Sequence, residues 1–224
     1  MAKLTALEIL NEVLQNAGLP TVSALTALTG IQNVAWDAIN EVIQDLGTSD
    51  HWKTLEASGA ITLGSNTSTY STATDQADVD YESFRYNQTK KLPYRTPQEF
   101  DRQYLTQTST GTPNVITEFG GYWRPYYIPD VAAHGKIISY RYWSKPTLLT
   151  TATSTGTCWI PETYDRTVLV NLATYRVLHY RGHPEAQVYY QKVYGGQNEE
   201  GSIVKFKRIH RSPSLTRLPV TEWF

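Results

Sequence analysis

The stretch IQNVAWDAINEVIQDL, residues Ile31–Leu46, determines the fold class of one part of this chain. Its apolar residues recur at spacings of three and four, which places them on one side of a helix. These residues are Ile31, Val34, Ala35, Ala38, Ile39, Val42, Ile43 and Leu46. Gly47 follows and ends the pattern. A broad apolar side must be buried, so the stretch predicts a helix that packs against other elements.

The same periodicity occurs near both ends of the chain. It predicts further helices at about Thr5–Ala17, Glu162–Arg181 and Pro184–Val193. Gly18 with Pro20 ends the first of these, and Gly182 with Pro184 separates the last two. We therefore expect a helical bundle domain made of residues 1–52 and 160–200, so that the two ends of the chain share one core.

The middle of the chain, residues 53–159, has a different pattern. It is rich in Thr, Ser, Tyr, Trp and Gly, and short alternating runs there predict strands. The main strand candidates are residues 60–63, 68–72, 79–86, 115–119, 121–124 and 136–143. Thr96 and Pro97 predict the start of a short helix. The predicted fold class is α+β, in which a bundle of N- and C-terminal helices carries an inserted antiparallel β domain.

Residues 201–224 have a basic and then an apolar character. The basic residues are Lys205, Lys207, Arg208, Arg211 and Arg217, and the acidic residue is Glu222. Pro213 and Pro219 disfavour regular structure, and the chain ends on the apolar pair Trp223 and Phe224. One reading is a tail that folds back on its own domain. The other is an extended C-terminal arm that uses these basic residues and the terminal pair to bind a partner or a neighbouring subunit.

Composition narrows the class of protein. Of the 224 residues, 40% are hydrophobic and 18% charged, so the chain can form a core. Its net charge of −1 argues against a dedicated nucleic-acid-binding protein. No apolar run approaches the ~20 residues of a membrane span. Glu8, Asn11 and Glu12 interrupt any signal-peptide core, so we expect synthesis and retention in a cytoplasm.

No constellation of residues strongly indicates chemistry, so we predict no enzyme, no cofactor and no metal. The single cysteine, Cys158, reads as a small buried residue rather than a nucleophile. His179 and His183 have the spacing of two metal ligands, but Gly182 breaks the helix between them. The residues Asp75, Asp78 and Asp80 lack the glycine and distal glutamate of a calcium loop, which favours a solvated loop.

Aromatic residues leave one alternative function open. The chain has 16 Tyr and 6 Trp against 5 Phe, which suits either partly wet protein interfaces or strands. The following could line a sugar-binding face: Trp123, Tyr126, Tyr127, Tyr140, Tyr142 and Trp143. The alternative is therefore a carbohydrate-binding or hydrolytic protein, and a helical protein with a β insertion and no such site is a third reading.

Several short stretches, taken in order, resemble the head-to-tail adaptor (connector) proteins of tailed bacteriophages, the group that includes tail tubular protein A of short-tailed phages. They are HWKTL (51–55), TPQEFD (96–101), TGTPN (110–114), YWRPYYIPD (122–130), YRYWSKPTLL (140–149), IPETY (160–164) and PEAQVYY (184–190). The resemblance covers about residues 5–200. It departs from the family around Tyr70–Asp75, which lacks the usual proline.

The resemblance implies a structural virion protein of the phage neck, made in the host cytoplasm. Its partners would be copies of itself in a dodecameric ring, the portal protein, the tail nozzle or tail tube protein, and DNA that passes without sequence-specific binding. No membrane partner is implied. Near-neutral charge agrees with a DNA channel, because a channel that neutralised phosphates would hold the DNA.

Overall fold

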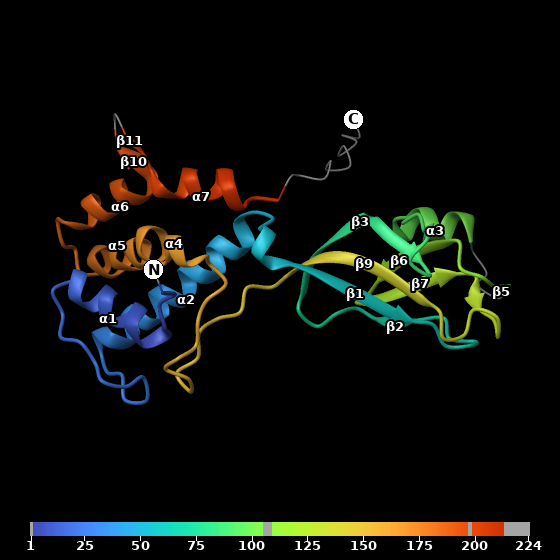
Figure 1. Cartoon of the computed structure of the whole chain (residues 1–224), viewed down its shortest axis with the longest axis horizontal. Helices are drawn as coiled ribbons and strands as arrows, with labels where there is room; N and C mark the ends of the chain where they lie inside the picture. The colour runs from blue at the N-terminus through green and yellow to red at the C-terminus, as the bar shows by residue number, and fades with distance from the viewer. Residues whose placement is uncertain (1, 105–108, 197–198, 213–224) are drawn as a thin grey trace. The chain divides into compact units, whose positions relative to one another are not determined.

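The computed structural model of the protein describes residues 2–104, 109–196 and 199–212. By its contacts the chain divides into two compact units (Figure 1). The helical unit comprises residues Met1–Leu55 and Pro146–Phe224, and the β unit comprises Glu56–Lys145. Helices and antiparallel sheets occur together, which confirms the α+β class.

The helical unit contains elements from both ends of the chain. Their bounds are α1 Ala6–Asn16, α2 Ile31–Ser49, the 3-10 helix η1 Lys53–Leu55, α4 Glu162–Tyr164, the π-helix η2 Asp165–Val170, α5 Asn171–Tyr180, α6 Ala186–Tyr194, the strands β10 Gly195–Gly196 and β11 Glu199–Glu200, and α7 Ser202–His210. The predicted helices at Thr5–Ala17 and Ile31–Leu46 are confirmed. The predicted helix at Glu162–Arg181 is confirmed as a run of α4, η2 and α5.

Sequence features account for the ends of these helices. Thr5 caps α1 with a capping box, because its hydroxyl accepts from the Glu8 N–H while the Glu8 carboxylate accepts from the Thr5 N–H. After α5, Gly182 adopts a φ of 66°, a left-handed conformation that suits glycine at a helix end. The chain then turns and continues as α6.

One hydrophobic core joins the two chain ends in the helical unit. It contains Ile9, Leu10 and Leu14 of α1 and Ile39 and Ile43 of α2, all fully buried. The later elements contribute Val168, Leu169, Ala173, Val177, Val193 and Phe206. Residues some 150 positions apart therefore depend on one another for burial.

The Ser/Thr-rich segment 147–157 belongs to the helical unit, whereas the expected division assigned it to the β insertion. Its backbone is held by both N-terminal helices. The Ala6 N–H donates to the Gly156 carbonyl at 2.7 Å, and the Asn40 side chain pairs with both backbone groups of Leu149. These contacts, absent from any local sequence pattern, decide which unit contains the segment.

The β unit is one continuous piece of chain. Its elements are β1 Glu56–Thr62, β2 Tyr70–Ser71, β3 Gln76–Tyr86, β4 Lys90–Lys91, α3 Pro97–Gln103, β5 Thr110–Gly111, β6 Val115–Phe119, β7 Tyr122–Tyr126, β8 Ile128–Pro129 and β9 Ile137–Ser144. The main sheet is antiparallel with the order β1-β9-β3-β4, and a second antiparallel sheet has the order β2-β7-β6. Helix α3 begins at the predicted Thr96 cap with Pro97 in its first turn.

Aromatic side chains fill the core of the β unit. Phe84 and Trp123 are fully buried, with ring centroids 5.0 Å apart, and Tyr140 lies 5.1 Å from Phe84. Gly59 lies directly beneath the Tyr140 ring, where a Cβ would approach its Cζ to 2.2 Å. The glycine is therefore required by packing and not by a turn.

Candidate partner-binding surfaces

The predicted extended arm is wrong over residues 202–210, which form helix α7. Ile203 and Phe206 lie on one side of this helix and are buried, whereas the prediction gave more weight to the charges and to the two prolines. Both prolines come after the helix, so they do not prevent it. Of the predicted partner-binding residues, Arg217, Trp223 and Phe224 lie outside the described residues.

Helix α7 is fixed to the core of the helical unit. The Phe206 ring stacks on Trp52 with centroids 4.5 Å apart and lies 5.0 Å from Tyr164. After the helix, the Ser212 N–H donates to the His51 carbonyl at 2.7 Å. Because α7 covers Trp52, it is part of the fold as well as part of the surface.

The outward side of α7 is basic and apolar. Lys205 and Arg208 are exposed there, together with Val204 and Ile209, the latter 54% exposed. Arg208 forms an ion pair with Glu200, and Arg211 forms one with Asp50 at 2.7 Å. Lys207 is half-buried. The structure thus brings Lys205 and Arg208 onto one exposed helix side, while Arg211 helps to hold the end of the helix.

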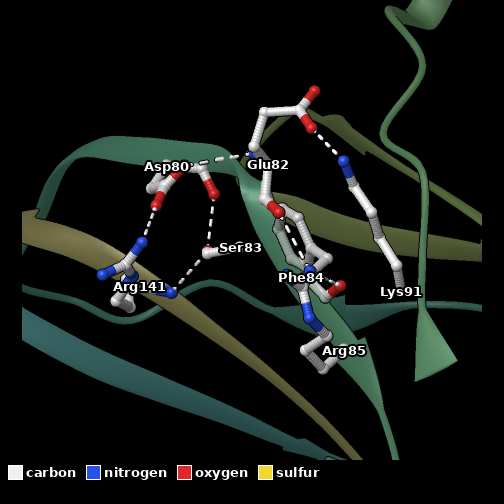
Figure 2. Close-up of polar contacts among 7 residues, drawn as sticks. All are labelled: Asp80, Glu82, Ser83, Phe84, Arg85, Lys91 and Arg141. Atoms are coloured by element: carbon white, nitrogen blue, oxygen red, sulfur yellow. Dashed lines mark hydrogen bonds and ion pairs between the residues drawn. The ribbon is translucent and has the colours of Figure 1, made fainter. Parts of the chain in front are cut away.

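The second prominent feature is a bulge in strand β3, shown in Figure 2. Pairing with β9 is regular from Asp78 to Asp80, which lies opposite Arg141, and resumes only at Arg85 opposite Ser139. The Arg141 guanidinium donates to the buried Asp80 carboxylate at 2.7 Å, and the Ser83 hydroxyl accepts from the Arg141 N–H (Figure 2). These contacts give the extra residues one fixed conformation.

Asp75 lies in an exposed turn, whereas Asp78 and Asp80 lie in strand β3, so the prediction of a solvated loop is wrong for those two residues. Asp80 is only 4% exposed. Its burial is tolerated because its carboxylate is paired with Arg141 and also accepts from the Glu82 N–H. The ladder partner lies more than sixty residues away, which no local pattern reveals.

A pocket of about 400 Å³ opens in the β unit next to this strand. Among the residues that line it are Thr72, Asp78, Tyr81, Glu118 and Lys145. Burial raises the pKa of the Glu118 carboxyl above its ordinary value, and the nearby Asp78 raises that pKa further. Two carboxylates in one pocket favour a cationic group. Sequence analysis missed this pair because residues 78 and 118 meet only through the sheets.

The proposed sugar-binding face does not exist as an exposed surface. Trp123, Tyr140, Tyr142 and Trp143 are all buried, so four of the six aromatic residues named for it serve the core. The exposed aromatic residues of the β unit are instead Phe119 and Tyr122. The sequence signal for them was the Phe-Gly-Gly-Tyr order, in which two glycines at a hairpin turn leave their neighbours at the tip.

Cys158 is buried, as predicted, and lies in an irregular segment. Its Sγ donates to the Asp165 carboxylate at 3.6 Å. Burial and the neighbouring Asp165 raise the pKa of the Cys158 thiol to about 11, which opposes formation of a thiolate.

Metal-binding and membrane features can be tested within the described ranges. There, no group of three or more His, Cys, Asp and Glu side chains is placed to hold a metal ion. His179 stacks on Tyr175, and His183 accepts from the Glu185 N–H. Among the helices of that same part of the chain, none has both the length and the apolar character to span a bilayer.

A family model described as SU10 adaptor protein matches residues 4–208, a range that includes both units and most of α7. The match confirms the adaptor resemblance that the ordered sequence motifs indicated. The narrower likeness to tail tubular protein A stays a prediction. No curated protein matches the chain closely enough to count as a relative.

Proposed function

The chain belongs to the SU10 adaptor protein family, and on that premise we propose that this phage head-to-tail adaptor forms a ring between the portal and the tail. The observation that carries the proposal is the family match over residues 4–208, which includes most of the helical unit, the whole β unit and their connections. The protein is a structural component of the virion neck, with a portal and a tail partner.

In its finer form, the proposal is a dodecameric ring that extends the DNA channel and receives the tail nozzle. A net charge of −1 supports a channel that DNA slides through, since a strongly basic wall would hold phosphates. Ring subunits contact neighbours on two sides and partners along the axis, so they need large interfaces. Each predicted domain would then make a different set of these contacts. These domains are the helical bundle (1–52 and 160–200), the β insertion (53–159) and the C-terminal segment (201–224).

For the portal contact we propose the exposed side of α7. Lys205 and Arg208 provide positive charge there, and Val204 and Ile209 provide apolar surface that is exposed to solvent. A surface with a basic and apolar character fits a partner with acidic and apolar groups. Arg211, Arg217, Trp223 and Phe224 would extend the contact along the chain towards a neighbouring subunit.

Truncation from Gly201 is a poor test of this contact, because it removes Phe206 from the core and uncovers Trp52. A sharper test reverses charge on the outward side of α7 with Lys205→Glu plus Arg208→Glu. The matched control is Lys90→Glu plus Arg102→Glu, which changes net charge equally at exposed positions of the β unit. Each protein is co-expressed with the portal encoded near its gene and viewed by negative-stain electron microscopy.

We expect the unaltered protein and the control to give a stacked double ring, whose class averages report the symmetry. The α7 variant should recover the portal at least tenfold less well. A double ring with the α7 variant would exclude this side of the helix and leave the adaptor role intact. Portal rings with nothing added, beside free unaltered protein, would overturn the proposed ring function.

A further inference from the structure

The hairpin between β6 and β7 presents two exposed aromatic rings. Its two-residue turn is Gly120 and Gly121, with φ values of 62° and 79°, the left-handed values that a tight hairpin needs. Phe119 and Tyr122 face each other across the ladder and are 62% and 50% exposed. We refer to residues 119–122 as the hairpin tip.

The hairpin tip is held in place. Both the N–H and the hydroxyl of Thr72 donate to the Gly121 carbonyl at 3.1 Å. These hydrogen bonds fix the backbone of the hairpin tip, while the Phe119 and Tyr122 rings remain exposed to solvent. Large apolar side chains that are both exposed and held in this way indicate a binding surface.

The pocket lined by Asp78 and Glu118, which we call the acidic pocket, adjoins the hairpin tip. Glu118, which lines the pocket, is the residue directly before Phe119, and Thr72 belongs to both features. Asp78 adds a second carboxylate. The one basic side chain of the lining is Lys145, whose Nζ donates to the Thr74 carbonyl at 3.4 Å. The surface thus combines a pocket suited to a cation with an apolar rim.

We propose that the acidic pocket and the hairpin tip bind residues 213–224 of a second copy of this chain, with Arg217 in the pocket and apolar neighbours of Arg217 on Phe119 and Tyr122. This inference rests on the proposed ring, which places copies side by side. It assigns the predicted basic and apolar terminus to one named surface on the neighbour.

The composition of the segment matches the surface. Residues 213–224 contain one cation, Arg217, between Leu215 and Leu218. A guanidinium is planar and carries five donors, so it can satisfy two carboxylates at once. The segment follows directly from Ser212, which is fixed by its hydrogen bond to His51, and a fully extended run of this length reaches at most about 40 Å. The proposal therefore requires the pocket of the neighbouring copy to lie within that reach.

The test measures binding of a fluorescein-labelled peptide of residues 212–224 to the chain ended at Ser212. That truncation keeps every described residue of both hydrophobic cores. We expect saturable binding at micromolar concentrations by fluorescence anisotropy. Glu118→Lys, or Arg217→Glu in the peptide, should weaken binding at least tenfold, and the two changes together should restore part of it.

The matched control is Glu82→Lys, an exposed carboxylate of the β3 bulge that does not line the pocket. It should leave binding unchanged. Phe119→Ala and Tyr122→Ala should each weaken binding severalfold, and circular dichroism spectra of both variants should match that of the unaltered protein because both side chains are exposed. Binding that ignores Glu118→Lys, or no binding up to millimolar peptide, would overturn the inference.

A mixing experiment tests whether the contact joins two copies. A tagged chain ended at Ser212 supplies an intact pocket, and an untagged full-length chain with Glu118→Lys supplies the terminal segment. Recovery of the untagged chain, lost when it also carries Arg217→Glu, supports the second copy as donor. If the peptide binds but the two chains do not associate, the segment binds only its own chain and the inference fails. Formation of the double ring with portal is measured separately, so failure of this inference can be distinguished from failure of the proposed ring.

Discussion

The helical unit and the β unit bury different kinds of side chain in their cores. The helical unit joins residues from the two ends of the chain, and aliphatic side chains such as Ile9, Ile39 and Leu169 dominate its core. The β unit is continuous in sequence, and large rings such as Phe84, Trp123 and Tyr140 fill its core. The core of the helical unit is therefore complete only when α7 is present, whereas the β unit is formed by one continuous segment.

This difference shows where each unit tolerates change. In the helical unit, α7 presents Lys205 and Arg208 on one side and buries Phe206 on the other, so surface and stability are coupled within one helix. In the β unit, the hairpin tip lies outside the core, and Phe119 can be removed without opening it. Binding and folding should be easier to separate in the β unit.

The largest expected effect comes from removing one buried ring in each unit. Phe206→Ala and Phe84→Ala should each cost about 3–5 kcal/mol, because each deletes a fully buried, stacked aromatic side chain. Hydrogen exchange read by mass spectrometry should show lost protection only in the unit that carries the change. Loss of protection in both units from either variant would show that they unfold together and would break the comparison.

A smaller effect should distinguish the two buried carboxylates. Asp80 of the β unit has Arg141 as its partner, whereas Asp165 of the helical unit accepts from the Leu4 N–H and the Cys158 thiol. Burial raises the pKa of Asp165 above its ordinary value, so ionised Asp165 lowers stability. That penalty is absent below the unfolded-state pKa and grows as pH rises through the folded-state pKa.

Asp165→Asn should therefore have a melting temperature close to that of the unaltered protein near pH 4 and above it at pH 7.5. Asp80→Asn should instead lose about 1 kcal/mol at pH 7.5, because it weakens a charge-assisted hydrogen bond. Thermal unfolding of both variants and of the unaltered protein across this pH range gives the melting temperatures. A melting temperature for Asp165→Asn that stays below that of the unaltered protein at every pH would contradict the expected penalty.

The smallest expected effect comes from removing a helix cap, a feature that occurs in both units. Thr5 and Thr96 each cap a helix with a capping box, to Glu8 and Glu99 respectively. Thr5→Ala and Thr96→Ala should each cost about 1 kcal/mol, and serine at either position should restore most of it. Urea titrations give the free energies of unfolding. Equal losses would show that a cap has the same value in either unit, and a negligible loss for Thr96→Ala would mean that α3 adds little to the β unit.

The sequence alone determined the local elements and the family. Helical periodicity located α1 and α2, the Thr96-Pro97 signal located α3, and alternation located β3, β6 and β9, because these patterns depend on residues close together in the chain. The ordered motifs were sufficient for the adaptor resemblance. Sequence reasoning failed at residues 202–210, where the buried pair Ile203 and Phe206 outweighed the charges that suggested an arm.

Which residues are exposed and which are buried depends on contacts that form only in the folded chain. Trp123 and Tyr140 looked suited to a binding face and are buried, while Asp80 looked solvated and is paired with Arg141 across the sheet. The pocket with Asp78 and Glu118 exists only where two sheets bring distant segments together. Burial and charge pairing depend on contacts between residues far apart in the chain, and such contacts leave no regular spacing in the sequence.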